Sequence, residues 1–198
     1  AFDLADQYRN PVMIVAEGNL GQMMEPVTFK DGTGKKFDKS DWVLTGTRNH
    51  KKGHLVSSIY LDPAELENYI NNTLFKKYNE MEKQEVRCEE YLMNDALVAL
   101  VAYGIVSRVA RSAVDDLRAL GIKAGLIRPI TLWTYPKQII NKRADQVKFF
   151  LVSEMSKGQM VEDVQLSVNG KKPVYFYGRV GGMIQAPDEL VNETKKYL

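Results

Sequence analysis

The second half of the sequence predicts an α/β domain whose sheet is mostly parallel and is covered by helices on both faces. Four short apolar runs, typical of buried strands, lie between residues 96 and 178. Segments whose apolar residues recur at helical spacing separate these runs, and glycine or proline punctuates the junctions. Strands that alternate with helices form right-handed crossovers, and such crossovers produce a parallel sheet.

Each element of this domain has its own signal. The helix expected over Ser107–Leu120 carries Val109, Ala113 and Leu117 on one face, and Gly121 is suited to end it as a C-cap. The strands are expected at residues 96–102, 124–127, 147–154 and 173–178. The other helices are expected at residues 136–143, 159–167 and 186–198, and Asn169-Gly170 should stop the second of these.

The first half is less regular. A helix is expected over residues 2–9, and the apolar run 11–16 predicts a buried parallel strand that ends in a glycine-containing turn. Residues 27–61 form a long excursion with little regular structure, within which residues 41–47 are strand-like. An excursion of this length is usually functional or packs against a partner.

A connecting helix should follow the excursion. Asp62 is a suitable N-cap, Pro63 suits the first helical position, and Glu65 places an acid in the first turn. The helix is expected to run to about Glu90. We therefore divide the chain into residues 1–61, a connecting segment over 62–92 and a main domain over 93–198.

Composition excludes several classes of protein. The 198 residues carry 27 basic and 25 acidic side chains, a formal charge of +2, which argues against binding to nucleic acid. The single cysteine, Cys88, cannot form an internal disulfide, and we find no signal peptide and no membrane-spanning run, so a cytoplasmic location is expected. Neighbouring glutamates should raise the pKa of the Cys88 thiol and make it unreactive.

Familiar catalytic motifs are missing from the sequence. His50 and His54 have the i,i+4 spacing of a zinc pair, but Gly53 weakens any helix there, so a surface loop is the better interpretation and no metal site is expected. Tyr103-Gly104 opens a helix after a strand without the glycines of a dinucleotide fingerprint or the lysine of a phosphate loop. No nucleophile elbow occurs.

The carboxyl edge of the predicted sheet is the remaining candidate region, because ligands of open α/β sheets bind there. The segments Glu154–Met160 and Arg179–Met183 follow two strands and should lie at this edge. Two interpretations of these segments remain open. They form a ligand or partner site, or they only end the strands. The candidate wall or interface residues are Gln22, Tyr103, Arg128, Gln159 and Arg179.

Several motifs together resemble a known family. The stretches Gly125–Trp133, Gly158–Asp163 and Tyr177–Gly182, with Ala102-Tyr103-Gly104, look like the α-type subunit of the 2-oxoacid:ferredoxin oxidoreductases, and most like its 2-oxoisovalerate members. The stretches Pro11–Ile14, Gly21–Met23 and Glu25–Val27 look like the end of that subunit's pyrimidine-binding domain. The resemblance implies a transketolase C-terminal-like fold for residues 93–198.

The resemblance also implies an activity. Members of the family oxidatively decarboxylate 2-oxoacids to acyl-coenzyme A in anaerobic metabolism and pass the electrons to ferredoxin, using thiamine diphosphate, Mg and iron–sulfur clusters. The implied partners are a thiamine-binding subunit, a ferredoxin-like subunit, ferredoxin and coenzyme A. The chain begins after the glutamate that activates thiamine in this family, and Cys88 alone cannot hold a cluster. We therefore assign no catalytic residue and no bound cofactor to the chain, and expect a C-terminal fragment that is inactive alone.

Two other functions remain open at this point. The chain could be an assembly module without ligand contacts, in which the excursion around Trp42 and Tyr60 buries against another subunit. It could also belong to another thiamine-dependent enzyme, such as a transketolase or a 2-oxoacid dehydrogenase.

Overall fold

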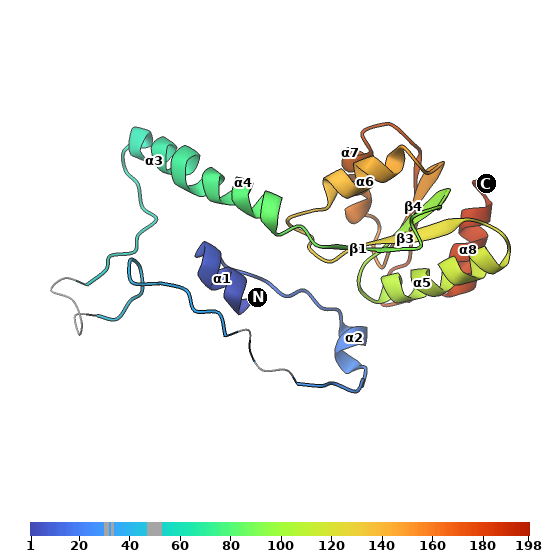
Figure 1. Ribbon diagram of the computed structural model, residues 1–198, viewed down its shortest axis with the longest axis horizontal. Helices are drawn as coiled ribbons and strands as arrows, with labels where there is room; N and C mark the ends of the chain where they lie inside the picture. The colour runs from blue at the N-terminus through green and yellow to red at the C-terminus, as the bar shows by residue number, and fades with distance from the viewer. Residues whose placement is uncertain (30–31, 33, 47–52) are drawn as a thin grey trace. The chain divides into compact units, whose positions relative to one another are not determined.

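The computed structural model describes residues 1–29, 32, 34–46 and 53–198, and it divides into two compact units (Figure 1). The sheet unit comprises Ala16–Met23 and Glu82–Leu198. The N-terminal unit comprises Ala1–Val15 and Met24–Met81. The domain limits given above stay a prediction, whereas Ala16–Met23 groups with the sheet, which the sequence did not indicate.

The sheet unit contains five strands in the order β1-β3-β2-β4-β5. The pairs β2–β3, β2–β4 and β4–β5 are parallel, and only β1 pairs antiparallel, along the outer side of β3. The predicted mostly parallel sheet is therefore confirmed. The strands are β1 (Cys88–Tyr91), β2 (Val98–Val101), β3 (Ala124–Pro129), β4 (Phe149–Glu154) and β5 (Val174–Gly178).

Helices cover both faces of this sheet, as predicted. On one face, α5 (Gly104–Ala119) and α8 (Pro187–Lys195) bury Ala113, Leu117 and Leu190 against Leu100 and Leu151 of the strands. On the other face, α6 (Lys137–Ala144) and α7 (Met160–Val168) cover side chains of the alternate strand positions, among them Phe150 and Val152. Alternate residues of β2 and β4 thus face opposite cores, which explains why these strands read as continuous apolar runs.

Two helices of the sheet unit end at the residues that the sequence predicts. Gly121 adopts φ +80° two residues after the end of α5, and its N–H donates to the Arg118 carbonyl. Asn169 adopts the left-handed conformation at the end of α7, and Gly170 follows with φ +73°. These positive φ angles are favourable for glycine and tolerated by asparagine, so both helices end where the sequence indicates.

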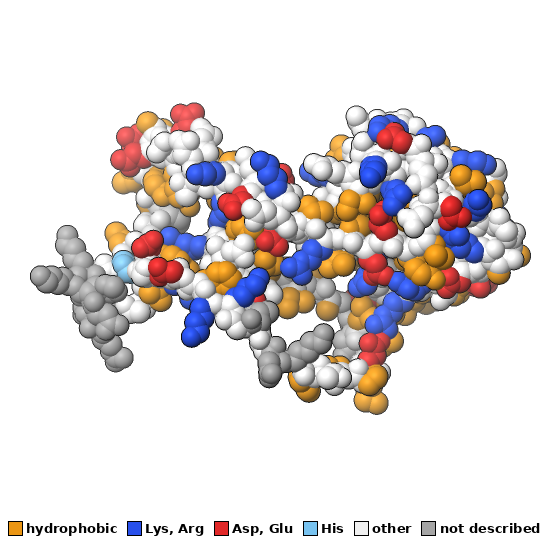
Figure 2. Space-filling view, viewed as in Figure 1, with side chains coloured by type: hydrophobic (Ala, Val, Ile, Leu, Met, Phe, Trp, Pro, Cys, Tyr) orange, Lys and Arg blue, Asp and Glu red, His pale blue; other side chains and the backbone are white. Residues whose placement is uncertain are grey.

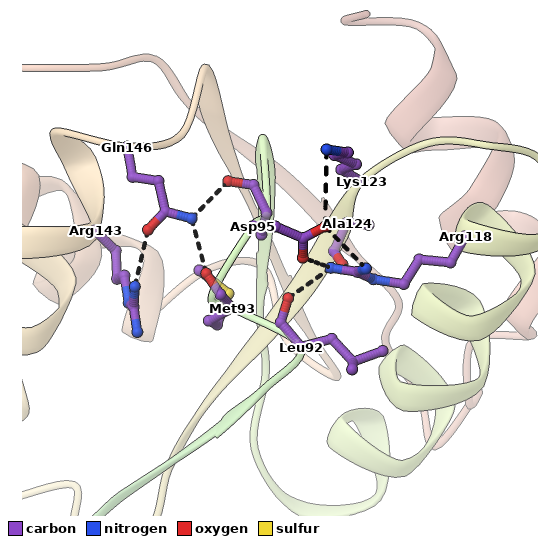
Figure 3. Close-up of polar contacts among 9 residues, drawn as sticks. Leu92, Met93, Asp95, Arg118, Lys123, Ala124, Arg143 and Gln146 are labelled. Carbon is purple, nitrogen blue, oxygen red and sulfur yellow. Dashed lines mark hydrogen bonds and ion pairs between the residues drawn. The ribbon is translucent and has the colours of Figure 1, made fainter.

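The amino edge of the sheet is closed by side chains that bond to backbone carbonyls (Figure 3). The Arg118 guanidinium donates to the carbonyl oxygens of Leu92 and Ala124 and to the Asp95 carboxylate, each at 2.7 Å. The hydrogen bond from Arg118 to Asp95 lowers the pKa of the Asp95 carboxyl group. The Gln146 amide donates to the carbonyl oxygens of Met93 and Ala96 at 2.7 and 2.8 Å. The loop between β1 and β2 is therefore fixed at this edge.

One expectation for the connecting segment was wrong. The helical segment comprises α3 (Pro63–Tyr69), a π-helical turn η1 (Ile70–Leu74) and α4 (Phe75–Gln84), and it ends six residues before Glu90. Its start is confirmed, because the Asp62 carboxylate accepts a hydrogen bond from the N–H of Ala64. Residues 88–91 instead form β1, because β3 offers a free edge with which they pair. Tertiary pairing overrides the local helical pattern here.

Two strand predictions in the first half were also wrong. Residues 11–16 follow α1 (Phe2–Tyr8) in an irregular conformation, and Met13 and Ile14 are largely exposed. No strand pairs with them in the described parts of the chain, and an apolar run without a paired neighbour forms no strand. In the segment 41–47, the described residues contain a turn, with the Val43 N–H donating to the Lys39 carbonyl, and no strand. Residue 47 lies outside the described residues.

The aromatic side chains of the excursion contact residues of their own unit. The Arg9 guanidinium lies 5.3 Å from the centre of the Trp42 ring, and the Tyr60 and Tyr69 rings stack at 4.9 Å. The Lys39 ammonium pairs with the Asp6 carboxylate at 2.8 Å. The excursion therefore packs within the N-terminal unit, of which it is a part, through several contacts.

A tight junction joins the end of β5 to the loop after β4. A Cβ atom at Gly178 would overlap the Ser156 carbonyl oxygen and would lie 2.5 Å from Cζ of the Phe176 ring. We expect Gly178→Ala to destabilise the sheet unit by roughly 2–3 kcal/mol, because the backbone must move to relieve the overlap. Urea unfolding followed by circular dichroism measures this loss. Gly21→Ala, also in the sheet unit, is the control, because its added Cβ has no atom within 4 Å and its φ angle is not positive. Its free energy of unfolding should stay within about 0.5 kcal/mol of the wild type. A loss equal to that of Gly178→Ala would contradict the interpretation.

Candidate functional site at the carboxyl edge of the sheet

Four parallel strands bring their carboxyl ends to one edge. Tyr103 follows β2, Arg128 is near the end of β3, Glu154 ends β4 and Arg179 follows β5. The chain leaves β2 for β3 on one side and later returns to β4 on the other side of β2. The carboxyl ends of β2 and β4 therefore form a topological switch point, the position at which open α/β sheets bind ligands.

Glu154 is the most buried charged group at this edge. Its side chain is buried, with the residue only 1% exposed, and its carboxylate accepts hydrogen bonds from the backbone N–H groups of Gln159, Met160 and Val161 at 3.0–3.2 Å. These groups form the N-terminus of α7, where backbone donors and the helix dipole stabilise a negative charge. Glu154 thus fixes the β4–α7 loop.

Glu17 plays a similar part at the neighbouring helix. Its carboxylate accepts a hydrogen bond of 2.6 Å from the backbone N–H of Ile105, in the first turn of α5. The short helix α2 (Gly18–Gln22) follows Glu17, and its Leu20 packs against the core on the α5 side of the sheet. Gly104 has φ +57°, and an added Cβ there would lie 3.2 Å from Glu17 Oε1, so glycine suits this junction for two reasons.

The two glutamates belong to similar sequence segments. Val15–Glu25 and Val152–Glu162 share the pattern V-x-E-x-x-x-G-Q-M-x-E, which gives six identical residues in eleven positions. Gln22 and Gln159 are unrelated candidates in the sequence prediction, and neither Glu17 nor Glu154 is predicted there as an anchor. The shared spacing was the signal that could have found them.

Tyr103 lies between these anchors. It is the N-cap residue of α5, and its half-buried ring packs against the core on the α6 and α7 side. Burial raises the pKa of its phenol, and the charges of Glu154 and Glu17 raise the pKa further. The Tyr103 hydroxyl has no hydrogen-bond partner among the residues that the structure describes.

The other candidate residues differ in their contacts and in their exposure to solvent. Arg128 donates to the Glu89 carboxylate of β1 at 2.9 Å, and Arg179 donates to the Glu189 carboxylate of α8 at 2.5 Å. Both guanidinium groups are thus engaged within the chain. Gln159, at the start of α7, and Gln22, at the end of α2, are exposed. Their roles as wall or interface residues stay predictions.

The edge also carries apolar side chains that face solvent. Two loops contribute them, one after β3 and one after β5, and each of these side chains is between 37% and 53% exposed. They are Ile130, Leu132, Trp133, Val180, Met183 and Ile184. Exposed apolar side chains gathered at one edge are typical of an interaction surface. By contrast, acidic and basic side chains are interspersed over the visible face of the sheet unit (Figure 2).

No cation site is found at this edge or elsewhere in the described residues. The chain contains no group of three or more potential metal ligands within the parts that the structure describes. His50 lies outside those parts, and His54 Nδ1 lies 2.9 Å from the Val43 carbonyl oxygen, consistent with a structural contact.

The helices in the described part of the chain are too short or too polar to span a lipid bilayer.

Cys88 is held as a protonated thiol. Burial raises its pKa to about 12, and the carboxylates of Glu90 and Glu89 contribute to the increase. The direction expected from the neighbouring glutamates is confirmed, although burial is the larger cause. A folded-state pKa above that of the unfolded chain keeps the thiol protonated until the pH approaches the folded value.

Slow alkylation of Cys88 follows from this pKa. At pH 8.5 we expect iodoacetamide to modify the folded chain about 100-fold more slowly than free glutathione. Only the thiolate reacts, and its fraction is roughly 1,000-fold lower in Cys88, while the greater nucleophilicity of a high-pKa thiolate offsets part of that difference. Mass spectrometry of samples quenched over time gives the rate. The same chain in 6 M guanidinium chloride is the control and should react at roughly the rate of glutathione. Equal rates in the folded and unfolded chains would refute a buried, protonated thiol.

A segment of the sheet unit matches a known protein family. Residues 96–190 match the family described as pyruvate:ferredoxin oxidoreductase core domain II. The matched residues contain β2 to β5 with α5, α6 and α7, and the resemblance to 2-oxoacid:ferredoxin oxidoreductase subunits that the sequence motifs indicated is confirmed.

Curated relatives extend the similarity beyond core domain II. The chain is 48% identical over 191 residues to the ketoisovalerate oxidoreductase subunit VorB of Methanothermobacter marburgensis, a match that covers 96% of this chain and 53% of that protein. It is 28% identical over 221 residues to the 2-oxoglutarate synthase subunit KorA of the same organism, covering 98% of this chain and 58% of that protein. The chain thus spans about half the length of the curated relatives it matches.

A solved structure shares the fold. It is the 2-oxoglutarate:ferredoxin oxidoreductase from Magnetococcus marinus, with 2-oxoglutarate, coenzyme A and succinyl-CoA bound. The TM-score is 0.61 at 22% identity, and the match covers 77% of this chain and 27% of that one. This likeness supports the α/β assignment of core domain II.

Proposed function

We propose that the chain is part of a subunit of an oxidoreductase that oxidatively decarboxylates a branched-chain 2-oxoacid to acyl-coenzyme A, with ferredoxin as electron acceptor. The observation that carries the proposal is the 48% identity to a ketoisovalerate oxidoreductase subunit along 96% of the chain, against 28% to a 2-oxoglutarate synthase subunit. The chain supplies core domain II and the carboxyl edge with Tyr103, and it has no turnover by itself.

The residues present favour cofactor sites outside this chain. Both helix N-termini at the switch point are occupied by the chain's own carboxylates, Glu17 on α5 and Glu154 on α7, so neither is free for the diphosphate of thiamine. Cys88 is a single protonated thiol, whereas an iron–sulfur cluster requires several thiolates. Thiamine diphosphate, Mg and the clusters are therefore assigned to a thiamine-binding subunit and a ferredoxin-like subunit in the assembled enzyme.

Substrate preference tests the proposal. The assembled enzyme, purified under anaerobic conditions through a tag on the full-length subunit, is assayed with 2-oxoisovalerate or 2-oxoglutarate, coenzyme A and ferredoxin. We expect kcat/KM to be at least about 10-fold higher for 2-oxoisovalerate, a difference that a fitted side-chain pocket can supply. Preference for 2-oxoglutarate, or turnover by the 198-residue chain alone, would contradict the proposal.

An assembly role without ligand contact is the second candidate function. The exposed apolar side chains of the loops after β3 and β5 favour it, since such side chains usually lie against a partner. Trp133→Ser and Met183→Ser in the full-length subunit distinguish the two functions. Loss of companion subunits with each variant favours assembly, and loss of turnover in an intact complex favours a site wall.

A further inference from the structure

Tyr103 combines three features that set it apart from the other polar residues of the carboxyl edge. It lies at the switch point between β2 and β4, its ring is held by the core, and its hydroxyl is unpartnered among the described residues. Arg128 and Arg179, at the same edge, are already paired with Glu89 and Glu189. Other side-chain oxygen atoms of the described residues also lack a partner, but they are fully buried, and they belong to Thr134, Tyr135, Ser153 and Gln185. Tyr103 is only half-buried, so the unpartnered hydroxyl that a ligand can reach at this edge is the Tyr103 phenol.

The surroundings of Tyr103 restrict what its hydroxyl can bind. Glu17 and Glu154 already supply the negative charge that the first turns of α5 and α7 stabilise, so an anionic group has no free helix end here. The same two carboxylates direct oxygen atoms toward backbone N–H groups, so they are poorly placed to hold a cation. Because burial and both glutamates raise the pKa of the phenol, Tyr103 remains a neutral hydrogen-bond donor near neutral pH.

Each of the two motif copies contributes one glutamate to the surroundings of Tyr103. Glu17 brings Ala16–Met23 onto α5, and Glu154 fixes the loop between β4 and α7. Both carboxylates occupy the third position of V-x-E-x-x-x-G-Q-M-x-E, and both are close enough to Tyr103 to affect its proton equilibrium. The repeated spacing thus places one anchor of each copy beside the same phenol.

We propose that Tyr103 contacts the substrate by donating a hydrogen bond to an uncharged carbonyl oxygen, such as an amide or thioester carbonyl, and that Glu17 and Glu154 are the positioning residues that hold it. A neutral acceptor fits the site because a phenol donor faces it and both helix ends are already filled. In the enzyme proposed above, the amide-bearing substrate is coenzyme A. The inference rests on that proposed function only for the identity of this ligand.

Direct binding tests the inference without turnover. Coenzyme A and, separately, 2-oxoisovalerate are titrated calorimetrically into the assembled enzyme without electron acceptor. We expect Tyr103→Phe, which removes only the hydroxyl, to raise the Kd of coenzyme A by 5- to 10-fold, since one neutral hydrogen bond contributes about 1 kcal/mol. The Kd of 2-oxoisovalerate should change less than about twofold. Tyr197→Phe is the matched control, because Tyr197 stacks on Tyr175 and bonds to Glu193 of α8, at the opposite edge of the sheet.

The positioning role has its own readout. Glu17→Ala should weaken coenzyme A binding as much as Tyr103→Phe does, whereas Glu17→Gln, which keeps an acceptor oxygen for the Ile105 N–H, should restore most of the affinity. Thermal unfolding of each variant checks that the fold is retained. An unchanged Kd of coenzyme A for Tyr103→Phe overturns the inference, and so does an equal weakening by Tyr197→Phe.

The outcomes separate this inference from the proposed function. Wild-type enzyme that oxidises 2-oxoisovalerate while Tyr103→Phe binds coenzyme A normally keeps the proposed function and refutes the role of Tyr103. Weakened coenzyme A binding in Tyr103→Phe, together with a wild-type preference for another 2-oxoacid, keeps the role of Tyr103 and refutes the assigned substrate.

Discussion

Replacement of Glu154 by alanine is expected to destabilise the sheet unit by roughly 3–5 kcal/mol, because it leaves several buried backbone donors without an acceptor. The carboxylate accepts from the N–H groups of Gln159, Met160 and Val161, and the residue is only 1% exposed. The loss of negative charge at the N-terminus of α7 adds to the effect. Urea unfolding of the 198-residue chain, followed by circular dichroism, measures the change in the free energy of unfolding.

Glu162→Ala is the matched control for this prediction. Glu162 is an exposed residue in the first turn of α7, and it occupies the last position of the same motif. Its replacement should change the free energy of unfolding by no more than about 0.5 kcal/mol. A comparable loss for both variants would mean that general helix-dipole effects, rather than the buried hydrogen bonds of Glu154, stabilise the loop.

Phe150→Ala should be equally severe, with an expected loss of roughly 3–5 kcal/mol. Phe150 is the second residue of β4, is fully buried, and packs in the core beneath α6 and α7 with Val152 and Ile140. Its truncation removes apolar burial and leaves a cavity that rigid neighbouring strands on both sides cannot fill. The midpoint of urea unfolding should fall while its slope stays constant.

Two further substitutions bracket the Phe150 result. Phe150→Leu keeps most of the side-chain volume and should cost less than half as much as Phe150→Ala. Leu166→Ala, at a residue of α7 that is 76% exposed, should stay within about 0.5 kcal/mol of the wild type. If Phe150→Ala cost less than roughly 1 kcal/mol, the core on this face of the sheet would be loosely packed, contrary to the structure.

The sequence alone predicted most of the sheet unit because its signals are local. Buried parallel strands appear in the sequence as apolar runs, and the helices between them show apolar spacing. The helix ends at Gly121 and Asn169 depend on single residues, as does the Asp62 cap in the N-terminal unit. Parallel strands joined by helices must place their carboxyl ends at one edge, so the position of Tyr103 and Arg179 at that edge also followed from the sequence.

Only the tertiary structure decided features that depend on distant partners. Residues 88–91 form a strand because β3 presents an edge to them, and residues 11–16 do not, because no neighbouring strand pairs with them in the described chain. Arg128 is engaged by Glu89, and the Tyr103 hydroxyl has no partner within the described part of the chain. The contact between Glu17 and Ile105 joins residues 88 positions apart. Hydrogen bonds and strand pairs of this kind depend on which groups meet in space, and local sequence patterns do not determine these long-range contacts.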